Sequence, residues 1–139
     1  MKKLLSIAFV IILLSACNSL NKTTETKKLE NTNWVLISIG NEKPSIENPV
    51  TLVFQQENKF LGKGVCNRYF GEYIQNEKQL KFQKVGSTKM ACPNLSVESN
   101  YFNLLNLVES FEIKNKQLLL KSKETTLIFE SSGDSEIQQ

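Results

Sequence analysis

Short runs of β-branched and aromatic residues, separated by tight turn signals, constrain the fold of this chain more than any other feature. Residues 34–39 read Trp-Val-Leu-Ile-Ser-Ile and stop at Gly40 and Asn41, which is the pattern of a strand followed by a turn. Similar runs recur along the chain, and the turns between them are so short that neighbouring strands should be antiparallel. The predicted strands are 34–39, 50–54, 59–65, 69–75, 79–85, 111–113, 117–121 and 125–129.

One segment, residues 95–109, has a different period. Its apolar residues recur at spacings of three and four, which predicts a single helix with one apolar face, at Val97, Tyr101, Leu104, Leu105 and Val108. Pro93, with Asn94 or Ser96, stands where this helix would begin and be capped. The expected fold class is α+β, mainly β: a strongly curved antiparallel sheet or open barrel of about eight short strands, with one helix packed against it.

The first segment has the features of a bacterial lipoprotein leader. Lys2 and Lys3 precede an apolar run over residues 4–14, which is shorter than the roughly 20 residues of a membrane-spanning helix. The Leu-Ser-Ala-Cys sequence that follows resembles the lipobox, whose cysteine becomes acylated, and several acyl chains give stable attachment. Cys17 is therefore the predicted site of lipid attachment. The alternative is an ordinary secretory signal with an incidental cysteine.

These features divide the chain into four parts. Residues 1–16 form the expected lipoprotein signal peptide, 17–30 the lipidated cysteine and a flexible tether, 31–130 the folded domain, and 131–139 a polar tail. The predicted location is the bacterial cell envelope, where the lipid on Cys17 makes the membrane a partner. Asn18 stands where an Asp would mark inner-membrane retention in enterobacteria, which favours the outer membrane facing the periplasm.

Composition argues against several classes of function. The chain has 17 Lys and Arg against 14 Asp and Glu, and without Lys2 and Lys3 the balance is 15 against 14, too even for a nucleic-acid partner. Because there is no histidine and Asp134 is the only aspartate, we expect no metal site and no cofactor. A serine or cysteine nucleophile would also lack its usual base. The protein is therefore not expected to be an enzyme.

Cys66 and Cys92 are the two cysteines that remain once Cys17 carries lipid. Pairing is favoured in an oxidising compartment, and in the chain-entropy model this bond would stabilise the fold by roughly 3.5 kcal/mol. Two separate buried thiols are the alternative. A redox pair is disfavoured because the chain has no Cys-x-x-Cys spacing and no histidine that would lower a thiol pKa.

Polar and aromatic residues gather near these cysteines in the sequence. They suggest a binding face for a small molecule, made of Asn67, Arg68, Tyr69, Thr88 and Lys89. The planar guanidinium of Arg68 would suit a carboxylate or a phosphate. The alternative is structural, with Asn67 and Thr88 serving the backbone of their own loops. In that case Arg68 would pair with Glu72 or Glu98, and the sequence leaves both interpretations open.

Three glycines, Gly62, Gly64 and Gly71, lie in the same window. They do not form a phosphate-binding loop, because no predicted strand here leads directly into the N-terminus of a helix. Glycines inside strands mark bulges or points where a sheet bends sharply. We therefore expect them to shape the sheet around the two cysteines.

Several of these motifs together resemble the META/HslJ domain family. The chain has Trp-x-Leu at 34–36, Gly-Val-Cys-Asn-Arg-Tyr-Phe-Gly-Glu-Tyr at 64–73, Ser-Thr-Lys-Met-Ala-Cys at 87–92, and Glu98 leading the predicted helix. The family pattern is Trp-x-Leu, Gly-Cys-Asn-x-Tyr-x-Gly-x-Tyr, Thr-x-Met-Ala-Cys and a Glu-led helix. The resemblance covers about residues 31–130, and it departs at Val65, where the family usually has a second glycine.

The resemblance implies a compact β-rich domain that is often carried by bacterial envelope lipoproteins. Some members are associated with heat-shock induction, novobiocin tolerance or, in trypanosomatid parasites, virulence. It implies no established enzyme activity, no agreed ligand and no catalytic residues. The expected function is that of a non-enzymatic envelope lipoprotein, a binding or protective module linked to stress and drug tolerance. The alternative is a structural or assembly module that docks on another envelope protein.

Overall fold

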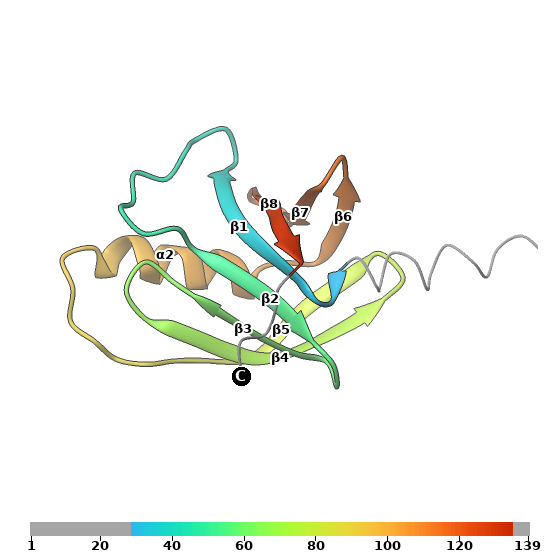
Figure 1. Cartoon of the computed structure of the whole chain (residues 1–139), viewed down its shortest axis with the longest axis horizontal. Coiled ribbons are helices and arrows are strands. Elements are labelled where there is room, and N and C mark those ends of the chain that lie inside the picture. Colours follow the sequence, from blue (N-terminus) through green and yellow to red (C-terminus); the bar gives the residue numbers. More distant parts are fainter. Residues whose placement is uncertain (1–28, 135–139) are drawn as a thin grey trace, which may run out of the picture.

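The computed structural model describes residues 29–134, and the predicted lipid attachment site, Cys17, lies outside the described residues. Within residues 29–134 the domain consists of eight strands and the helix α2 (Figure 1). In chain order they are β1 (Thr32–Ile39), β2 (Thr51–Gln55), β3 (Lys59–Lys63), β4 (Arg68–Asn76), β5 (Gln79–Ser87), α2 (Leu95–Asn106), β6 (Ser110–Lys114), β7 (Gln117–Lys121) and β8 (Thr126–Asp134).

The strands form a closed antiparallel barrel in chain order. The predicted fold class, mainly β with a strongly curved sheet and one packed helix, is confirmed, and the barrel is closed rather than open. Closure comes from a ladder between β1 and β8, whose register shifts twice, between Thr32 and Trp34 and between Leu36 and Ser38. Such irregularities bend a strand, which brings the two ends of the sheet together. The seam between β5 and β6 is the shortest, with a single register pair.

The described fold extends beyond the predicted domain limits at both ends. At the N-terminal end it includes Leu29, whose side chain is fully buried and whose carbonyl accepts a hydrogen bond from the Trp34 indole at 3.2 Å. It continues through β8 to Asp134 rather than ending at Glu130, because this strand follows β1 to the first residue of the ladder. Residues 29–30, predicted as part of the tether, and 131–134, predicted as part of the tail, therefore belong to the described fold.

Two hairpin turns use left-handed backbone at residues other than glycine. Glu57 and Asn58 have φ of 60° and 56° between β2 and β3, and Asn115 and Lys116 have φ of 50° and 65° between β6 and β7. Two successive residues with positive φ match the twist of the strands that they connect. Both turns fall in the gaps between predicted strands, the first between 50–54 and 59–65 and the second between 111–113 and 117–121.

Aromatic rings fill one side of the barrel interior. Phe54 contacts Tyr73 with ring centroids 5.1 Å apart, and the ring of Phe60 lies 4.9 Å from that of Phe82 in an edge-to-face arrangement. Tyr69 continues the series at 6.0 Å from Phe60. Because these residues alternate with outward-facing ones along β2 to β5, the sheet has one apolar face that is buried.

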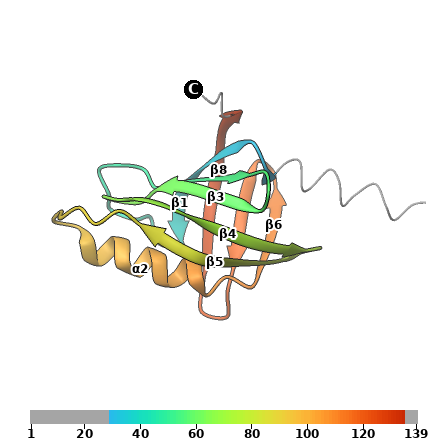
Figure 2. The ribbon, with the colours of Figure 1, turned by 90° about the horizontal axis from the view of Figure 1, so that it is seen from below.

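The helix α2 runs alongside β5 (Figure 2). It buries Glu98, Tyr101 and Leu105, which share one face at spacings of three and four. The helix ends at Asn106, three residues before the predicted end at Glu109, because the Glu109 amide already pairs with Lys121 of β7. Within residues 29–134 no helix is both long and apolar enough to cross a membrane.

Candidate functional site

The loop between β3 and β4 is held against α2 by a single carboxylate. Oε2 of Glu98 accepts hydrogen bonds from the backbone amides of Cys66 and Asn67, both at 2.7 Å. Its other oxygen, Oε1, accepts from Nδ2 of Asn67 at 2.6 Å. Gly64 makes room for this carboxylate, since a Cβ there would lie 2.6 Å from Oε2. The carboxylate therefore serves as a structural acceptor for three donors.

The side chain of Asn67 extends the network to a third segment. Its Oδ1 accepts hydrogen bonds from the Thr88 hydroxyl at 2.8 Å and from the Met90 amide at 2.7 Å. Asn67 thus joins its own loop, α2 and the segment that follows β5. We call the bonded group of Asn67, Glu98, Thr88 and the backbone of Cys66 and Met90 the Asn67–Glu98 clasp.

The clasp keeps Glu98 ionised. Burial raises the pKa of this carboxyl, because its side chain is only 2% exposed. The hydrogen bonds from Asn67 and from the Cys66 amide together lower the pKa by more than burial raises it. The net pKa lies below the ordinary value of a glutamate. A charged acceptor forms stronger hydrogen bonds than a neutral one, so the ionised form stabilises the clasp.

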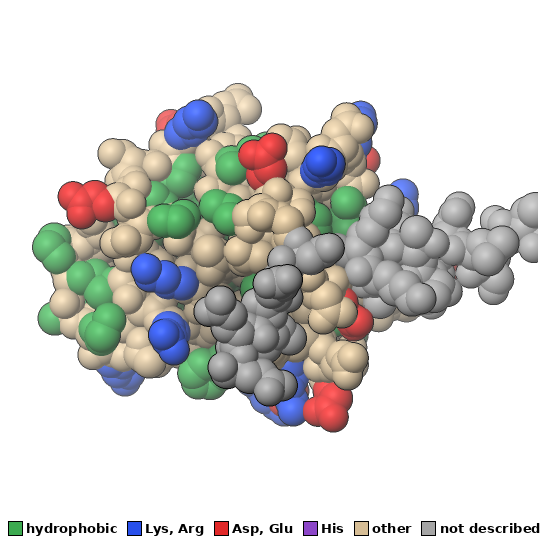
Figure 3. All heavy atoms as spheres, viewed as in Figure 1, with side chains coloured by type: hydrophobic (Ala, Val, Ile, Leu, Met, Phe, Trp, Pro, Cys, Tyr) green, Lys and Arg blue, Asp and Glu red, His purple; other side chains and the backbone are tan. Residues whose placement is uncertain are grey.

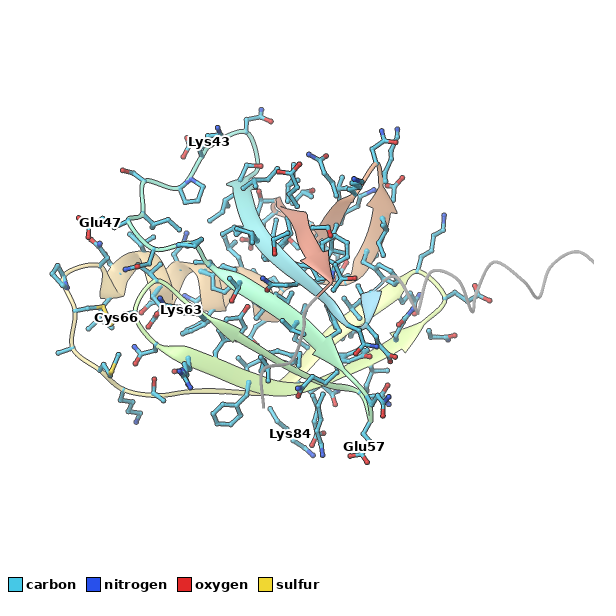
Figure 4. All side chains as sticks on the ribbon, in the orientation of Figure 1. Lys43, Glu47, Glu57, Lys63, Cys66 and Lys84 are labelled. Carbon is cyan, nitrogen blue, oxygen red and sulfur yellow. A yellow bond between two sulfur atoms is a disulfide. The ribbon has the colours of Figure 1, made fainter. Side chains whose placement is uncertain are left out.

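A disulfide between Cys66 and Cys92 ties the same two segments together. Their Cα atoms lie 6.3 Å apart, and 26 positions separate them in the sequence. Cys66 lies at the end of the molecule where α2 begins (Figure 4). The covalent bond and the clasp therefore act on one junction, the point where the β3–β4 loop meets the segment between β5 and α2.

Two tyrosines support the junction from inside the barrel. The Tyr69 hydroxyl donates to the backbone oxygen of Thr51 at 2.7 Å and lies 2.7 Å from the Tyr101 hydroxyl. Because the single hydroxyl hydrogen of Tyr69 is used on a carbonyl, Tyr101 donates to Tyr69. Burial raises the pKa of both tyrosines, so the pair stays neutral.

A surface pocket of about 390 Å³ lies beside the clasp. Part of its lining is polar, from Thr88, Lys89 and Ser99, and part is apolar. The apolar part includes Met90 and Leu95, which are 57% and 41% exposed, together with Phe102. Exposed apolar side chains next to a cation and hydroxyls suit a small amphipathic ligand better than a purely polar one.

The five residues of the predicted binding face do not share one surface. Asn67 and Tyr69 are buried, at 2% and 1% exposure, while Arg68 between them faces outward. Thr88 and Lys89 line the pocket, with the Thr88 hydroxyl engaged in the clasp. Both side chains therefore have a structural role, as the alternative proposed, but they do not serve their own loops. Asn67 bonds the backbone of Met90, and the Thr88 hydroxyl accepts from the Arg68 amide. Ligand binding by the exposed members, Arg68 and Lys89, stays a prediction.

The ion pair of Arg68 with Glu72 or Glu98, which was part of the structural alternative, is not formed among the described residues. Glu98 is occupied by the clasp, and Glu72 forms an ion pair with Lys84 at 2.8 Å. Among the described residues no carboxylate forms an ion pair with Arg68. The alternation along β4 turns Arg68 outward, away from the buried side chain of Asn67.

The structural role of Glu98 escaped the sequence analysis. A signal was present, because Glu98 falls three positions before Tyr101 and seven before Leu105, on the buried face of the helix. An acid on an apolar face needs strong hydrogen-bond donors, and the nearby loop supplies them. Within residues 29–134 no group of three His, Cys, Asp or Glu side chains could hold a metal ion.

Comparison with known proteins agrees with this arrangement. The family model of the META domain matches residues 27–134. The chain belongs to the META domain family. The META family is not a known family of enzymes, which suggests a non-catalytic module. No curated protein matches the chain significantly.

Solved structures share the META fold. An NMR structure of a protein from Burkholderia xenovorans has a TM-score of 0.66 and 27% identity, covering 78% of this chain and 87% of that one. A second NMR structure has a TM-score of 0.62 and 23% identity, covering 75% and 92% of the two chains. A DUF4847 family protein from Bacteroides vulgatus, at 14% identity, has a TM-score of 0.60 and covers 76% and 96%.

Proposed function

We propose that this META domain is a non-enzymatic module of the bacterial envelope, anchored by lipid on Cys17, that binds a small amphipathic molecule and contributes to stress or drug tolerance. The observation that carries the proposal is the pocket beside the Asn67–Glu98 clasp. The clasp and the disulfide hold two walls of this pocket in place, and Lys89, Met90 and Phe102 present a cation and apolar groups to it.

The chemistry near the pocket supports binding rather than catalysis. The carboxylate of Glu98 accepts three hydrogen bonds and has a lowered pKa, which is the opposite of what a general acid needs. Cys66 and Cys92 are joined and do not offer a thiolate. The groups that remain accessible in the pocket are suited to recognise a ligand and not to transform it.

Native mass spectrometry tests the binding proposal. The chain from Asn18 to Gln139, secreted into an oxidising compartment, should carry an additional mass that disappears on denaturation. The double variant Lys89→Glu/Met90→Asp should lose that mass, because it replaces a positive charge of the pocket by a negative one and removes an exposed apolar side chain. The matched control is Lys43→Glu/Leu107→Asp, which makes the same changes outside the pocket lining. A bare mass for the unmodified chain would contradict ligand binding.

Palmitate labelling tests the anchor separately. In growing cells the full chain should incorporate labelled palmitate and sediment with outer membranes, whereas Cys17→Ala should stay unlabelled. Labelling of Cys17→Ala, or none in the unmodified chain, would contradict lipid attachment at this residue. In a deletion strain, tolerance to heat or novobiocin should be restored by the control variant and not by the pocket variant.

The alternative is an assembly module that docks on another envelope protein. It is favoured by exposed apolar side chains outside the pocket, notably Leu61 and Phe70, which are 40% and 56% exposed. Site-specific crosslinking from position 70 in intact cells would distinguish it, because this function predicts one defined protein adduct.

A further inference from the structure

The outer face of β2, β3 and β4 carries a short apolar strip. Strand register places Val53 opposite Leu61 and Leu61 opposite Phe70, and all three alternate with buried neighbours. On β5 the position opposite Phe70 is Gly86, and a Cβ there would lie 3.2 Å from the Phe70 ring. The ring therefore lies beside bare backbone and remains 56% exposed. We call Val53, Leu61 and Phe70 the apolar strip.

One side of the strip is cationic without compensating acid. Lys63 and Arg68 are register partners on β3 and β4, two positions along from Leu61 and Phe70 and on the same outer face. Their neighbours across the sheet are hydroxyl residues, Thr51 and Thr88, whose oxygens accept from the Lys63 and Arg68 backbone amides. Among the described residues, neither cation forms an ion pair.

The other side of the strip is balanced in charge. Lys59 forms an ion pair with Glu57 at 2.9 Å, and Lys84 pairs with Glu72 at 2.8 Å. Lys63 lies toward the end of the strands near α2, and Lys84 and Glu57 lie toward the other end (Figure 4). Basic side chains lie beside hydrophobic ones over this part of the surface (Figure 3). The uncompensated positive charge is thus confined to one edge of the strip.

From this arrangement we propose that the outer face of β2 to β4 docks on an anionic lipid surface. Leu61 and Phe70 enter the boundary between headgroups and acyl chains, and Lys63 and Arg68 contact lipid phosphates. An aromatic and an aliphatic side chain bordered by cations match the two layers of such an interface, an apolar layer beneath an anionic one. A face with so few exposed apolar side chains is small for a stable protein interface, which buries about 800 Å² per partner.

The entry point of the chain favours a membrane over a protein partner. The first described residues lie beside β2. Glu30 forms a parallel β-bridge with Phe54, and the Asn31 amide donates to the Phe54 carbonyl at 3.2 Å. Phe54 is the neighbour of Val53, so the chain enters the domain next to the strip. This step rests on the proposed lipid anchor at Cys17. The eleven residues 18–28 span at most about 40 Å, which keeps the face at high effective concentration near the bilayer.

Vesicle binding tests the proposal without relying on the anchor. Residues 29–134 hold the closed barrel and its buried core, so the chain from Asn18 to Gln139 keeps every described contact. This chain should bind vesicles of equal parts phosphatidylcholine and phosphatidylglycerol, and should bind phosphatidylcholine alone far more weakly. Lys63→Glu/Arg68→Glu should weaken binding by more than about tenfold, because each cation contributes electrostatic attraction at an anionic surface.

Matched variants separate the face from net charge. Lys43→Glu/Lys116→Glu makes the same charge change on the β1–β2 loop and on the β6–β7 turn, and should change binding by less than about twofold. Phe70→Ser should weaken binding in both low and moderate salt, and because the ring is exposed this variant stays folded.

Equal losses in the two charge variants, or equal binding to both vesicle types, would overturn the proposal. So would a defined protein adduct at position 70 in cells together with no vesicle binding. Absence of lipid on Cys17 would contradict the proposed function and leave the vesicle result unaffected, so the two failures are distinguishable.

Discussion

Neighbouring residues at the start of β4 serve opposite purposes. Asn67 and Tyr69 turn inward and are almost fully buried, whereas Arg68 and Phe70 turn outward on the same short stretch. The two-residue period of a strand produces this division. The inward set completes the Asn67–Glu98 clasp and the tyrosine pair, and the outward set forms part of the apolar strip and its cationic edge.

The two sets differ in how fully their polar groups are satisfied. Among the described residues no buried side-chain nitrogen or oxygen lacks a hydrogen-bond partner, and the clasp accounts for much of this. On the outer face, Lys63 and Arg68 lie side by side without an acidic partner. Groups that are fully bonded inside the protein stabilise the fold, and groups left unpaired outside are available to a partner. The following changes separate these two roles.

The largest loss of stability is expected from the clasp. Glu98→Ala leaves three hydrogen-bond donors without their acceptor. Each buried donor without a partner costs roughly 1–3 kcal/mol, so we expect the free energy of unfolding to fall by about 4 kcal/mol. Glu98→Gln keeps the shape but loses the charge and presents an amide to donors, and should cost about 2 kcal/mol. Urea unfolding measures both. A loss below about 0.5 kcal/mol for either variant would show that the clasp is not structural.

The disulfide should contribute almost as much. Reduction of Cys66–Cys92 frees a loop across 26 positions and should lower the free energy of unfolding by about 3.5 kcal/mol in the chain-entropy model. Unfolding with and without reductant measures the effect, and Cys66→Ala/Cys92→Ala, which should not respond to reductant, is the control. Unchanged vesicle binding by the reduced but folded protein would sharpen the contrast with the outer face.

Two glycines give a matched comparison between the buried and the exposed side. Gly62→Ala places a Cβ 2.1 Å from the Thr51 carbonyl and 2.5 Å from the Tyr69 ring, both fixed, and should cost about 2–3 kcal/mol. At Gly86 the nearest atoms, at 3.2 Å, belong to the exposed Phe70 ring, which can move aside. Gly86→Ala should therefore cost less than about 1 kcal/mol. Thermal unfolding of the two variants in parallel would reveal equal costs if this comparison is mistaken.

The smallest change in stability is expected at Phe70. Because its ring is 56% exposed, Phe70→Ser should alter the free energy of unfolding by less than about 0.5 kcal/mol. The same variant should lose vesicle binding, so stability and binding would separate at one position. A large loss of stability would mean that the strip is part of the fold and not a docking surface.

Much of the fold could be predicted from the sequence because local chemistry and topology agree. Strand runs, hairpin turns such as Asn115-Lys116 and the amphipathic spacing around Tyr101 each indicate their own structure. Closure of the barrel could not be predicted, because it depends on register shifts in β1 and on the continuation of β8 to Asp134, in a polar segment with no apolar pattern.

The candidate site was predictable in composition but not in arrangement. The sequence pointed to the window around Asn67 and Thr88, and its structural alternative anticipated that both bond backbone groups. Those groups belong to the opposite segment, Met90 for Asn67 and Arg68 for Thr88, and not to their own loops. That the β3–β4 loop bonds to Glu98 of α2 could not be derived, because one sequence gives no distance between Asn67 and Glu98. The direction of the Arg68 side chain could not be derived either, since it depends on where β4 begins.

The central claim is that the Glu98 carboxylate stabilises the clasp in its ionised form. It is tested by the pH dependence of the difference in free energy of unfolding between the unmodified protein and Glu98→Gln. The folded pKa of Glu98 lies below the unfolded value near 4.3, so its contribution is fully present above that pH and is lost as pH falls through the folded pKa. Urea unfolding of the unmodified protein and of Glu98→Gln, from about pH 7 to about pH 2, gives the difference directly. Other carboxyls with lowered pKa, Glu57 and Glu112, are present in both proteins and cancel.

We predict that the difference is constant down to about pH 4.3 and then shrinks toward zero, because a protonated Glu98 and a glutamine offer similar hydrogen bonding. A difference that stays constant across this range, or that grows in acid, would show that the charge on Glu98 does not hold the clasp together.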